Sequence, residues 1–164
     1  MTAKKVSPAG ELTDALYQCQ MNPPRRIFVV DQDPYIRHFS AEVLIRQGYE
    51  VNAAEDGAAA WKELQANNYN LLIIEQKIPK VSGVELLKKI HATRMDLPVI
   101  LATRTLPTKT FTLLPWLQAA TILRKPYTFE KLLGMVKNVL YATAIVRGEI
   151  TPPSIWQNQP SAVG

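Results

Sequence analysis

Leu71-Leu72-Ile73-Ile74-Glu75 is the stretch of sequence that decides the fold of this chain. Four consecutive large apolar residues, with no alternation between apolar and polar, are typical of a strand that is buried on both faces of a parallel sheet. Glu75 follows the apolar run directly, so it is expected at the carboxyl end of that strand. Open α/β sheets place their ligand sites at this edge.

Four similar runs flank this stretch and alternate with helical patterns. Strands are predicted at residues 26–30, 50–54, 71–74, 98–103 and 121–124. The run at 50–54 is the weakest of the five and predicts a strand near an edge of the sheet. Helices are predicted to begin at Asp33-Pro34, Asp56-Gly57 and Ser82-Gly83, because capping residues precede a helical period there. A last helix is predicted over Thr128–Tyr141.

This alternation predicts the fold class. Strands joined by helices form right-handed crossovers and a parallel sheet that helices cover on both faces. The expected class is therefore α/β, a flavodoxin-like doubly wound five-stranded parallel sheet with helices on both faces. Its ligand crevice would lie at the carboxyl ends of the strands. The polar residues just past those ends are Asp31, Gln32, Glu75, Thr103 and Lys125.

The chain divides into three expected parts. Residues 1–24 form an N-terminal leader with a short helix at 11–21, residues 25–141 form the domain, and residues 142–164 form a flexible C-terminal tail. Within the domain, Thr105–Ala120 is the least helical segment, because it contains four threonines and two prolines. Its apolar residues either form a remodelled docking surface or cover the sheet as a distorted helix.

Composition narrows the class of protein. The chain has 164 residues, a net charge of +5 and one cysteine, Cys19, which excludes an internal disulfide. The basic residues are scattered rather than arranged as a stripe on one helix, which does not favour nucleic-acid binding. The sequence contains neither an apolar run of membrane-spanning length nor the pattern of a signal peptide, so a cytoplasmic location is expected.

Four motifs resemble those of the receiver domain of bacterial response regulators, the CheY-like family. In chain order they are Val29–Pro34, Glu75–Leu86, Pro98–Thr103 and Lys125–Tyr127, and the resemblance covers about residues 25–141. It implies that Glu75 stands where the family carries the aspartate that accepts phosphate from a histidine kinase. It also implies that Thr103 is the switch threonine and that Lys125 is the invariant lysine, followed by a cis Lys125-Pro126 bond.

The chain departs from the family pattern at three positions. Receivers bind Mg²⁺ through an acidic pair after the first strand and the acceptor aspartate, but Gln32 is a neutral amide and Glu75 is longer by one methylene. Mg²⁺ demands hard oxygen ligands, and phosphoryl transfer depends on positioning, so both changes are expected to impair phosphorylation. Ile122 also stands where receivers commonly carry a switching aromatic residue.

The cofactor prediction follows from these departures. No cofactor is expected. Weak Mg²⁺ binding is the alternative, and it would use Asp31, Glu75 and the backbone carbonyl of Lys77.

Glu75 has two interpretations. It either mimics a phosphoryl group by reaching toward Lys125 and Thr103, or it forms a static ion pair with Lys125. The ion pair is favoured, because a carboxylate reproduces only part of the contacts of a phosphate.

The resemblance leads to two predicted functions. The first is an atypical, pseudo-receiver domain in two-component phosphorelay signalling that acts by phosphorylation-independent protein–protein interaction and is not an enzyme. The second is a phosphoacceptor receiver with relaxed chemistry that still takes phosphate from a histidine kinase. The expected partner is a histidine kinase or a downstream signalling protein, bound through the Thr105–Tyr141 face. A homodimer is left open, and no membrane contact is expected.

Overall fold

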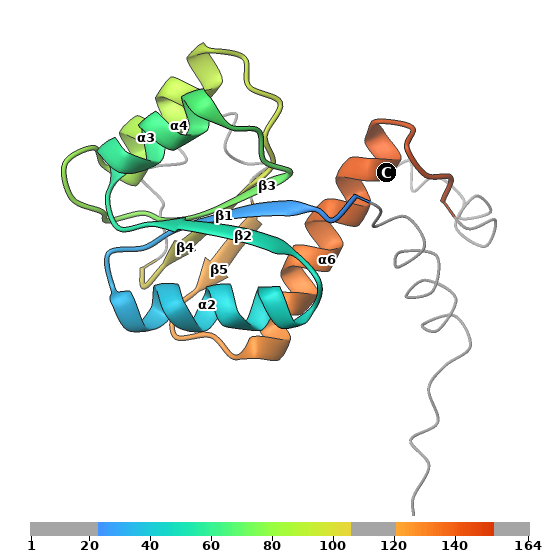
Figure 1. The fold of residues 1–164 in the computed structure, drawn as a ribbon, viewed down its shortest axis with the longest axis horizontal. Helices are drawn as coiled ribbons and strands as arrows, with labels where there is room; N and C mark the ends of the chain where they lie inside the picture. The colour runs from blue at the N-terminus through green and yellow to red at the C-terminus, as the bar shows by residue number, and fades with distance from the viewer. Residues whose placement is uncertain (1–22, 106–120, 153–164) are drawn as a thin grey trace, which may run out of the picture.

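A computed structural model describes residues 23–105 and 121–152 of the chain. Within these ranges, five parallel strands form one sheet in the order β2-β1-β3-β4-β5 (Figure 1). The strands are β1 (Arg26–Val30), β2 (Glu50–Ala54), β3 (Leu71–Glu75), β4 (Val99–Thr103) and β5 (Thr121–Arg124). The doubly wound fold is therefore confirmed, and β2 lies at an edge as its weaker apolar pattern predicts.

Helices cover both faces of the sheet. They are α2 (Pro34–Arg46), α3 (Gly57–Ala66), α4 (Gly83–Ala92) and α6 (Phe129–Val146). α3 and α4 lie on one face, and α2 and α6 on the other (Figure 1). Alternate residues of β1 divide between two cores: Phe28 packs with Leu64 and Leu87, whereas Val29 packs with Leu44 and Val136. No helix in the described part of the chain is both long and apolar enough to cross a bilayer.

The helices begin where the sequence predicts, for reasons of capping. The side chain of Asp33 accepts the backbone N–H of Tyr35 at 2.9 Å. The side chain of Asp56 accepts the backbone N–H of Ala59 at 2.8 Å. Ser82 and Glu85 form a reciprocal capping box at the start of α4. These contacts satisfy donors that the first helical turn leaves free.

The last helix is longer than the sequence indicates. Its predicted end at Tyr141 is wrong, because α6 continues to Val146 with Ala144 buried against the domain. Beyond the helix, Arg147 pairs with Asp96 at 2.9 Å, and Glu149 pairs with Arg25 at 2.8 Å. The expected tail therefore begins inside a helix that tertiary contacts hold in place. The predicted leader helix, most of the irregular Thr105–Ala120 segment and the end of the tail lie outside the described residues.

α3 approaches the loop between β3 and α4 very closely. The backbone N–H of Gly57 donates to the carbonyl of Pro79 at 3.1 Å. A Cβ atom on Gly57 would lie 1.8 Å from the carbonyl oxygen of Val81. Lys80 strengthens this contact by pairing with Asp56 at 3.0 Å. The start of α3 thus holds the loop that follows Glu75 through one backbone hydrogen bond and one ion pair.

Gly57→Ala is expected to destabilise the domain by about 1–3 kcal/mol, because two backbone segments must separate to admit the methyl group. Gly134→Ala is the matched control, since a Cβ there meets open space on α6. It is expected to stabilise by up to about 1 kcal/mol through its higher helix propensity. Urea unfolding would measure both. A Gly57 variant as stable as the natural chain would contradict the close approach.

Candidate functional site

Three charged side chains meet at the carboxyl edge of the sheet. Asp31 follows β1, Glu75 ends β3, and Lys125 follows β5. The Lys125 Nζ lies 2.5 Å from Asp31 Oδ2 and 2.9 Å from Glu75 Oε1. The side chains of Lys125, Asp31 and Glu75 are only 2%, 4% and 10% exposed. One buried ammonium group therefore balances one of the two carboxylate charges, and we call these three residues the charged triad.

Burial leaves Glu75 with an altered acidity. Loss of hydration raises the pKa of Glu75 above its ordinary value of 4.5, and the charge of Asp31 raises it further. The hydrogen bond and the charge of Lys125 act in the opposite direction. Burial prevails, so the Glu75 carboxyl is easier to protonate than an exposed glutamate.

Gln32 joins two loops of the site. Its backbone N–H donates to Glu75 Oε2 at 3.3 Å, and its side-chain Nε2 donates to the carbonyl of Lys77 at 3.0 Å. Both carboxylate oxygens of Glu75 thus have donors, Oε1 from Lys125 and Oε2 from Gln32. The side-chain amide links the loop after β1 to the loop after β3.

The residues present do not fit a Mg²⁺ ion in this arrangement. The expected ligands were the carboxylates of Asp31 and Glu75 and the carbonyl of Lys77. Lys125 lies against both carboxylates, and the amide of Gln32 occupies the carbonyl. Mg²⁺ needs near-octahedral oxygen coordination, so an ion here would have to compete with Lys125 and Gln32 for these oxygens.

Thr103 lies at the end of β4 but contacts residues other than the triad. Its hydroxyl oxygen is 2.8 Å from Gln76 Oε1 and 2.8 Å from the carbonyl of Thr105. The mimic interpretation requires Glu75 to reach Thr103, whereas the contacts of Glu75 run to Lys125 and Gln32. The geometry agrees with the static ion pair.

Sequence reasoning missed two residues at this edge. Gln76 contacts Thr103, and the only signal for it is its place directly after Glu75. The Tyr127 hydroxyl lies 2.8 Å from the hydroxyl of Ser40 on α2, and burial raises the pKa of Tyr127 above its ordinary value. Tyr127 stands in a motif that the sequence had singled out, but its partner comes from a distant helix.

One further feature agrees with a sequence-based expectation. The Lys125-Pro126 peptide bond is cis. Ile122 is half-buried and packs against the core that α3 and α4 cover.

The sheet order and the acidic, lysine-containing edge define a receiver-type α/β domain, and comparison with known proteins identifies its family. The response regulator receiver domain family matches residues 27–137. The chain belongs to this family. It is accordingly a receiver domain of two-component signalling.

Relatives and solved structures agree with this assignment. Response regulator MprA of Mycobacterium sp. (strain KMS) is 28% identical over 79% of this chain and 56% of its own length. A CheY-like receiver domain protein from Methanospirillum hungatei is 27% identical, with a TM-score of 0.68 over 74% of this chain and 98% of its own.

A third similar protein was solved with ligands. TrrA of Thermotoga maritima, in complex with Mg²⁺ and BeF, is 33% identical, with a TM-score of 0.61 over 70% of this chain and 98% of its own. The chain spans about half the length of most of the curated relatives that it matches.

Titration of Glu75 would test the electrostatics of the site. We expect the carboxyl carbon of Glu75 to titrate with a midpoint above 4.5 in a ¹³C NMR experiment, because it is buried beside Asp31. Since the folded-state pKa is raised, Glu75 contributes stability below pH 4.5 that is lost as the pH rises through its folded-state pKa.

Glu63 is an internal control for this titration. The hydrogen bond from Tyr69 lowers the pKa of Glu63, so its midpoint should fall below 4.5 in the same spectra. A Glu75 midpoint at or below 4.5 would contradict the dominance of burial.

Lys125→Met is expected to destabilise the domain by about 3–5 kcal/mol at neutral pH, because two buried carboxylates lose their cation. Lys131→Met is the control, since Lys131 is exposed on α6 and its replacement should cost less than about 0.5 kcal/mol. Chemical unfolding at pH 7 measures both variants. Equal stabilities of the two variants would show that Lys125 does not hold the triad together.

Proposed function

We propose that this chain is a receiver domain that acts by phosphorylation-independent protein–protein interaction and is not itself an enzyme. The observation that carries the proposal is the charged triad. Lys125 bonds to both Asp31 and Glu75 in a buried site, and Gln32 donates to the second oxygen of Glu75. Each oxygen of Glu75 thus already accepts a hydrogen bond, and these contacts would have to loosen for the carboxylate to approach a phosphoryl donor.

Positioning also weighs against phosphoryl transfer. The reaction depends on an in-line approach to a positioned nucleophile and on neutralisation of the charge that develops. Glu75 is longer than the aspartate of the family and is held toward Lys125 at 2.9 Å. Where the family carries the second carboxylate of its metal-binding pair, this chain has Gln32, whose side-chain amide donates to the carbonyl of Lys77. Both requirements are therefore poorly met in this chain.

The alternative is a receiver with relaxed chemistry that still takes phosphate from a histidine kinase. Asp31, Thr103 and Lys125 all stand at the strand ends where receiver chemistry occurs, and this retention favours the alternative. It requires Lys125 and Gln32 to release Glu75 before a donor arrives. Weak Mg²⁺ binding belongs to this alternative.

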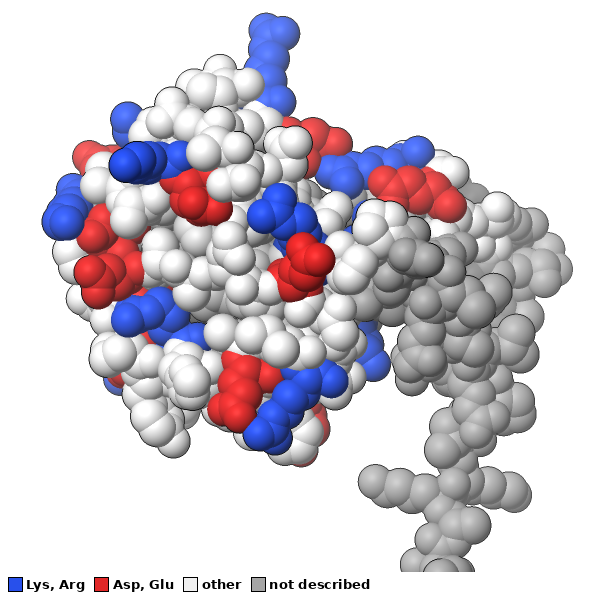
Figure 2. Space-filling model, in the orientation of Figure 1, with Lys and Arg blue, Asp and Glu red and all other residues white. Residues whose placement is uncertain are grey.

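The proposed partner is a histidine kinase or a downstream signalling protein that binds the Thr105–Tyr141 face. Only part of this face is described. On α6, Phe129 is an exposed large apolar residue at the start of the helix. Nucleic acid is a poorer candidate, because basic and acidic side chains are interspersed on the face that Figure 2 shows, rather than gathered in a basic stripe.

Amide NMR during addition of Mg²⁺ and then beryllofluoride, a phosphoryl mimic, tests the proposal. The natural chain should show no saturable shifts at Asp31, Thr103 or Lys125. The double variant Gln32→Asp with Glu75→Asp restores the acidic pair and the acceptor of the family. It should respond at those three residues, and its unfolding temperature should rise with Mg²⁺, because a ligand stabilises the state that binds it.

The opposite result is equally clear. Saturable shifts in the natural chain, at Mg²⁺ concentrations that also move the double variant, would make Glu75 a working acceptor and favour the alternative. A single variant, Gln32→Asp, separates the two changes. If it gains Mg²⁺ binding without beryllofluoride binding, the length of Glu75 is what blocks the acceptor chemistry.

A further inference from the structure

The outer edge of β2 points backbone groups away from the sheet. Among the described residues, β2 is the end strand. Its Glu50 donates its N–H to the Arg25 carbonyl at 3.0 Å, and the Ala54 carbonyl accepts from Asp31 at 3.1 Å. Since these groups alternate in direction along a strand, the N–H and C=O groups of Val51 and Ala53 face outward, with those of Glu55 beyond them.

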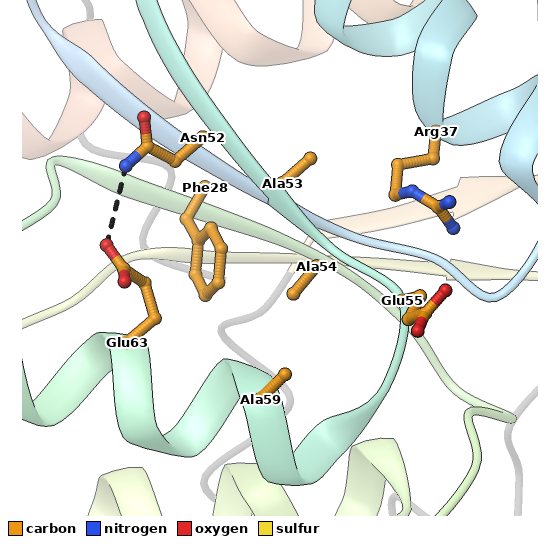
Figure 3. Close-up of a pocket in the computed structure, with 8 residues that line it drawn as sticks. All are labelled: Phe28, Arg37, Asn52, Ala53, Ala54, Glu55, Ala59 and Glu63. Carbon is orange, nitrogen blue, oxygen red and sulfur yellow. Dashed lines mark hydrogen bonds between the residues drawn. The ribbon is translucent and has the colours of Figure 1, made fainter.

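Small side chains leave this edge open. A groove of about 560 Å³ runs along β2 and is lined by Ala53, Ala54 and Ala59, with Phe28 at its base. Figure 3 shows the alanines between two polar ends, one with Arg37 and Glu55 and the other with the hydrogen-bonded pair Asn52 and Glu63. No large side chain from α2 or α3 among the lining residues closes the middle of the groove.

The centre of this edge lacks the usual protection against strand pairing. Monomeric proteins commonly guard an edge strand with lysine, proline or a bulge. The central residues Val51-Asn52-Ala53-Ala54 contain no charged residue and no proline, although Glu50 and Glu55 flank them, and β2 pairs with β1 in a continuous register. This stretch is therefore competent to pair with another strand.

An exposed apolar residue lies beside the same edge. Arg37, Ala41 and Ile45 are spaced four residues apart, so they follow one flank of α2. Arg37 borders β2, whereas Phe39 and Val43, on the other flank, border α6. Ile45 is 54% exposed. Ile45 is therefore available for contact with a partner that approaches this edge of the sheet.

The geometry points to a second copy of this chain as the occupant of the edge. Two β2 strands pair antiparallel across a two-fold axis centred on Ala53, and the sheet continues from one subunit into the other. Centring on Ala53 uses all the outward groups: Ala53 pairs with its own copy, and Val51 pairs with Glu55 of the partner subunit. The result is about six new backbone hydrogen bonds.

The side chains on both faces of the sheet are compatible with this antiparallel pairing of two β2 strands. Asn52 meets the partner's Ala54, and Ala53 meets its own copy, so the centre of the pairing is free of steric crowding. The same axis brings the Arg37–Ala41–Ile45 flank of α2 against its own copy, and Ala41 permits a close approach. The acidic ends of the strand already have cations, since Glu50 pairs with Arg26 at 3.6 Å and Asp56 with Lys80 at 3.0 Å. An interface of this kind is self-complementary.

Sedimentation equilibrium and amide hydrogen exchange of the full chain test this inference, which does not rest on the proposed function. The chain should show a monomer–dimer equilibrium. The amides of Asn52 and Ala54 face β1 and should be protected at every protein concentration. Those of Val51, Ala53 and Glu55 should become protected only as the dimer forms.

Two variants act on the edge in different ways. Ala53→Pro removes one outward N–H but none of the bonds to β1, so an edge position tolerates it. Ile45→Ser removes the apolar contact without touching the strand. Each should weaken dimerisation about tenfold or more. Val146→Ser is the matched control, because Val146 is 87% exposed at the end of α6 and its replacement should leave dimerisation unchanged.

Several results would overturn the inference. A chain that stays monomeric at all concentrations has no such dimer. A dimer in which the outward amides exchange freely, or which survives both Ala53→Pro and Ile45→Ser, forms through another surface. Protection of Val51, Ala53 and Glu55 that does not depend on concentration would mean that another part of the chain covers the edge. Persistent protection of Asn52 and Ala54 in the proline variant confirms that the strand is intact.

Discussion

A single buried cation organises the carboxyl edge of this domain. Lys125 bonds to carboxylates that arrive from β1 and β3, so three strand ends are held around one ammonium group. A buried charge that loses its partner is strongly destabilising, which restricts the rearrangements open to these loops. The positive charge of Lys125 offsets the repulsion between Asp31 and Glu75, so both carboxylates can lie beside it. Burial nevertheless keeps the pKa of Glu75 raised.

The loop after β3 depends on this triad and on contacts around it. Gln32 holds the loop at the carbonyl of Lys77, and Gly57 holds it at the carbonyl of Pro79. A Cβ on Gly83 would lie 2.5 Å from the carbonyl oxygen of Glu75, so α4 also starts directly against the strand end. Together these contacts make a site that both side chains and backbone hold in place.

Much of the fold follows from local patterns. The apolar runs and capping residues predicted all five strands and the starts of α2, α3 and α4, because burial and capping act over a few residues. The end of α6 was not predicted: the helix continues past Tyr141, where Ala144 is buried against the domain and Arg147 pairs with Asp96. Gln76 and the Ser40–Tyr127 contact also escaped, because hydrogen bonds between distant segments leave no periodic trace.

The sequence by itself determined the class of fold, and it predicted the edge on which the site lies and the two positions, Gln32 and Glu75, at which the resemblance implies a departure from the family pattern. Only the tertiary structure decided how those two residues act. It directs Glu75 to Lys125 and Gln32 rather than to Thr103, and it turns the amide of Gln32 toward Lys77. The reason is physical: residue type limits which hydrogen bonds a side chain can make, but the packing of four separate loops selects among them.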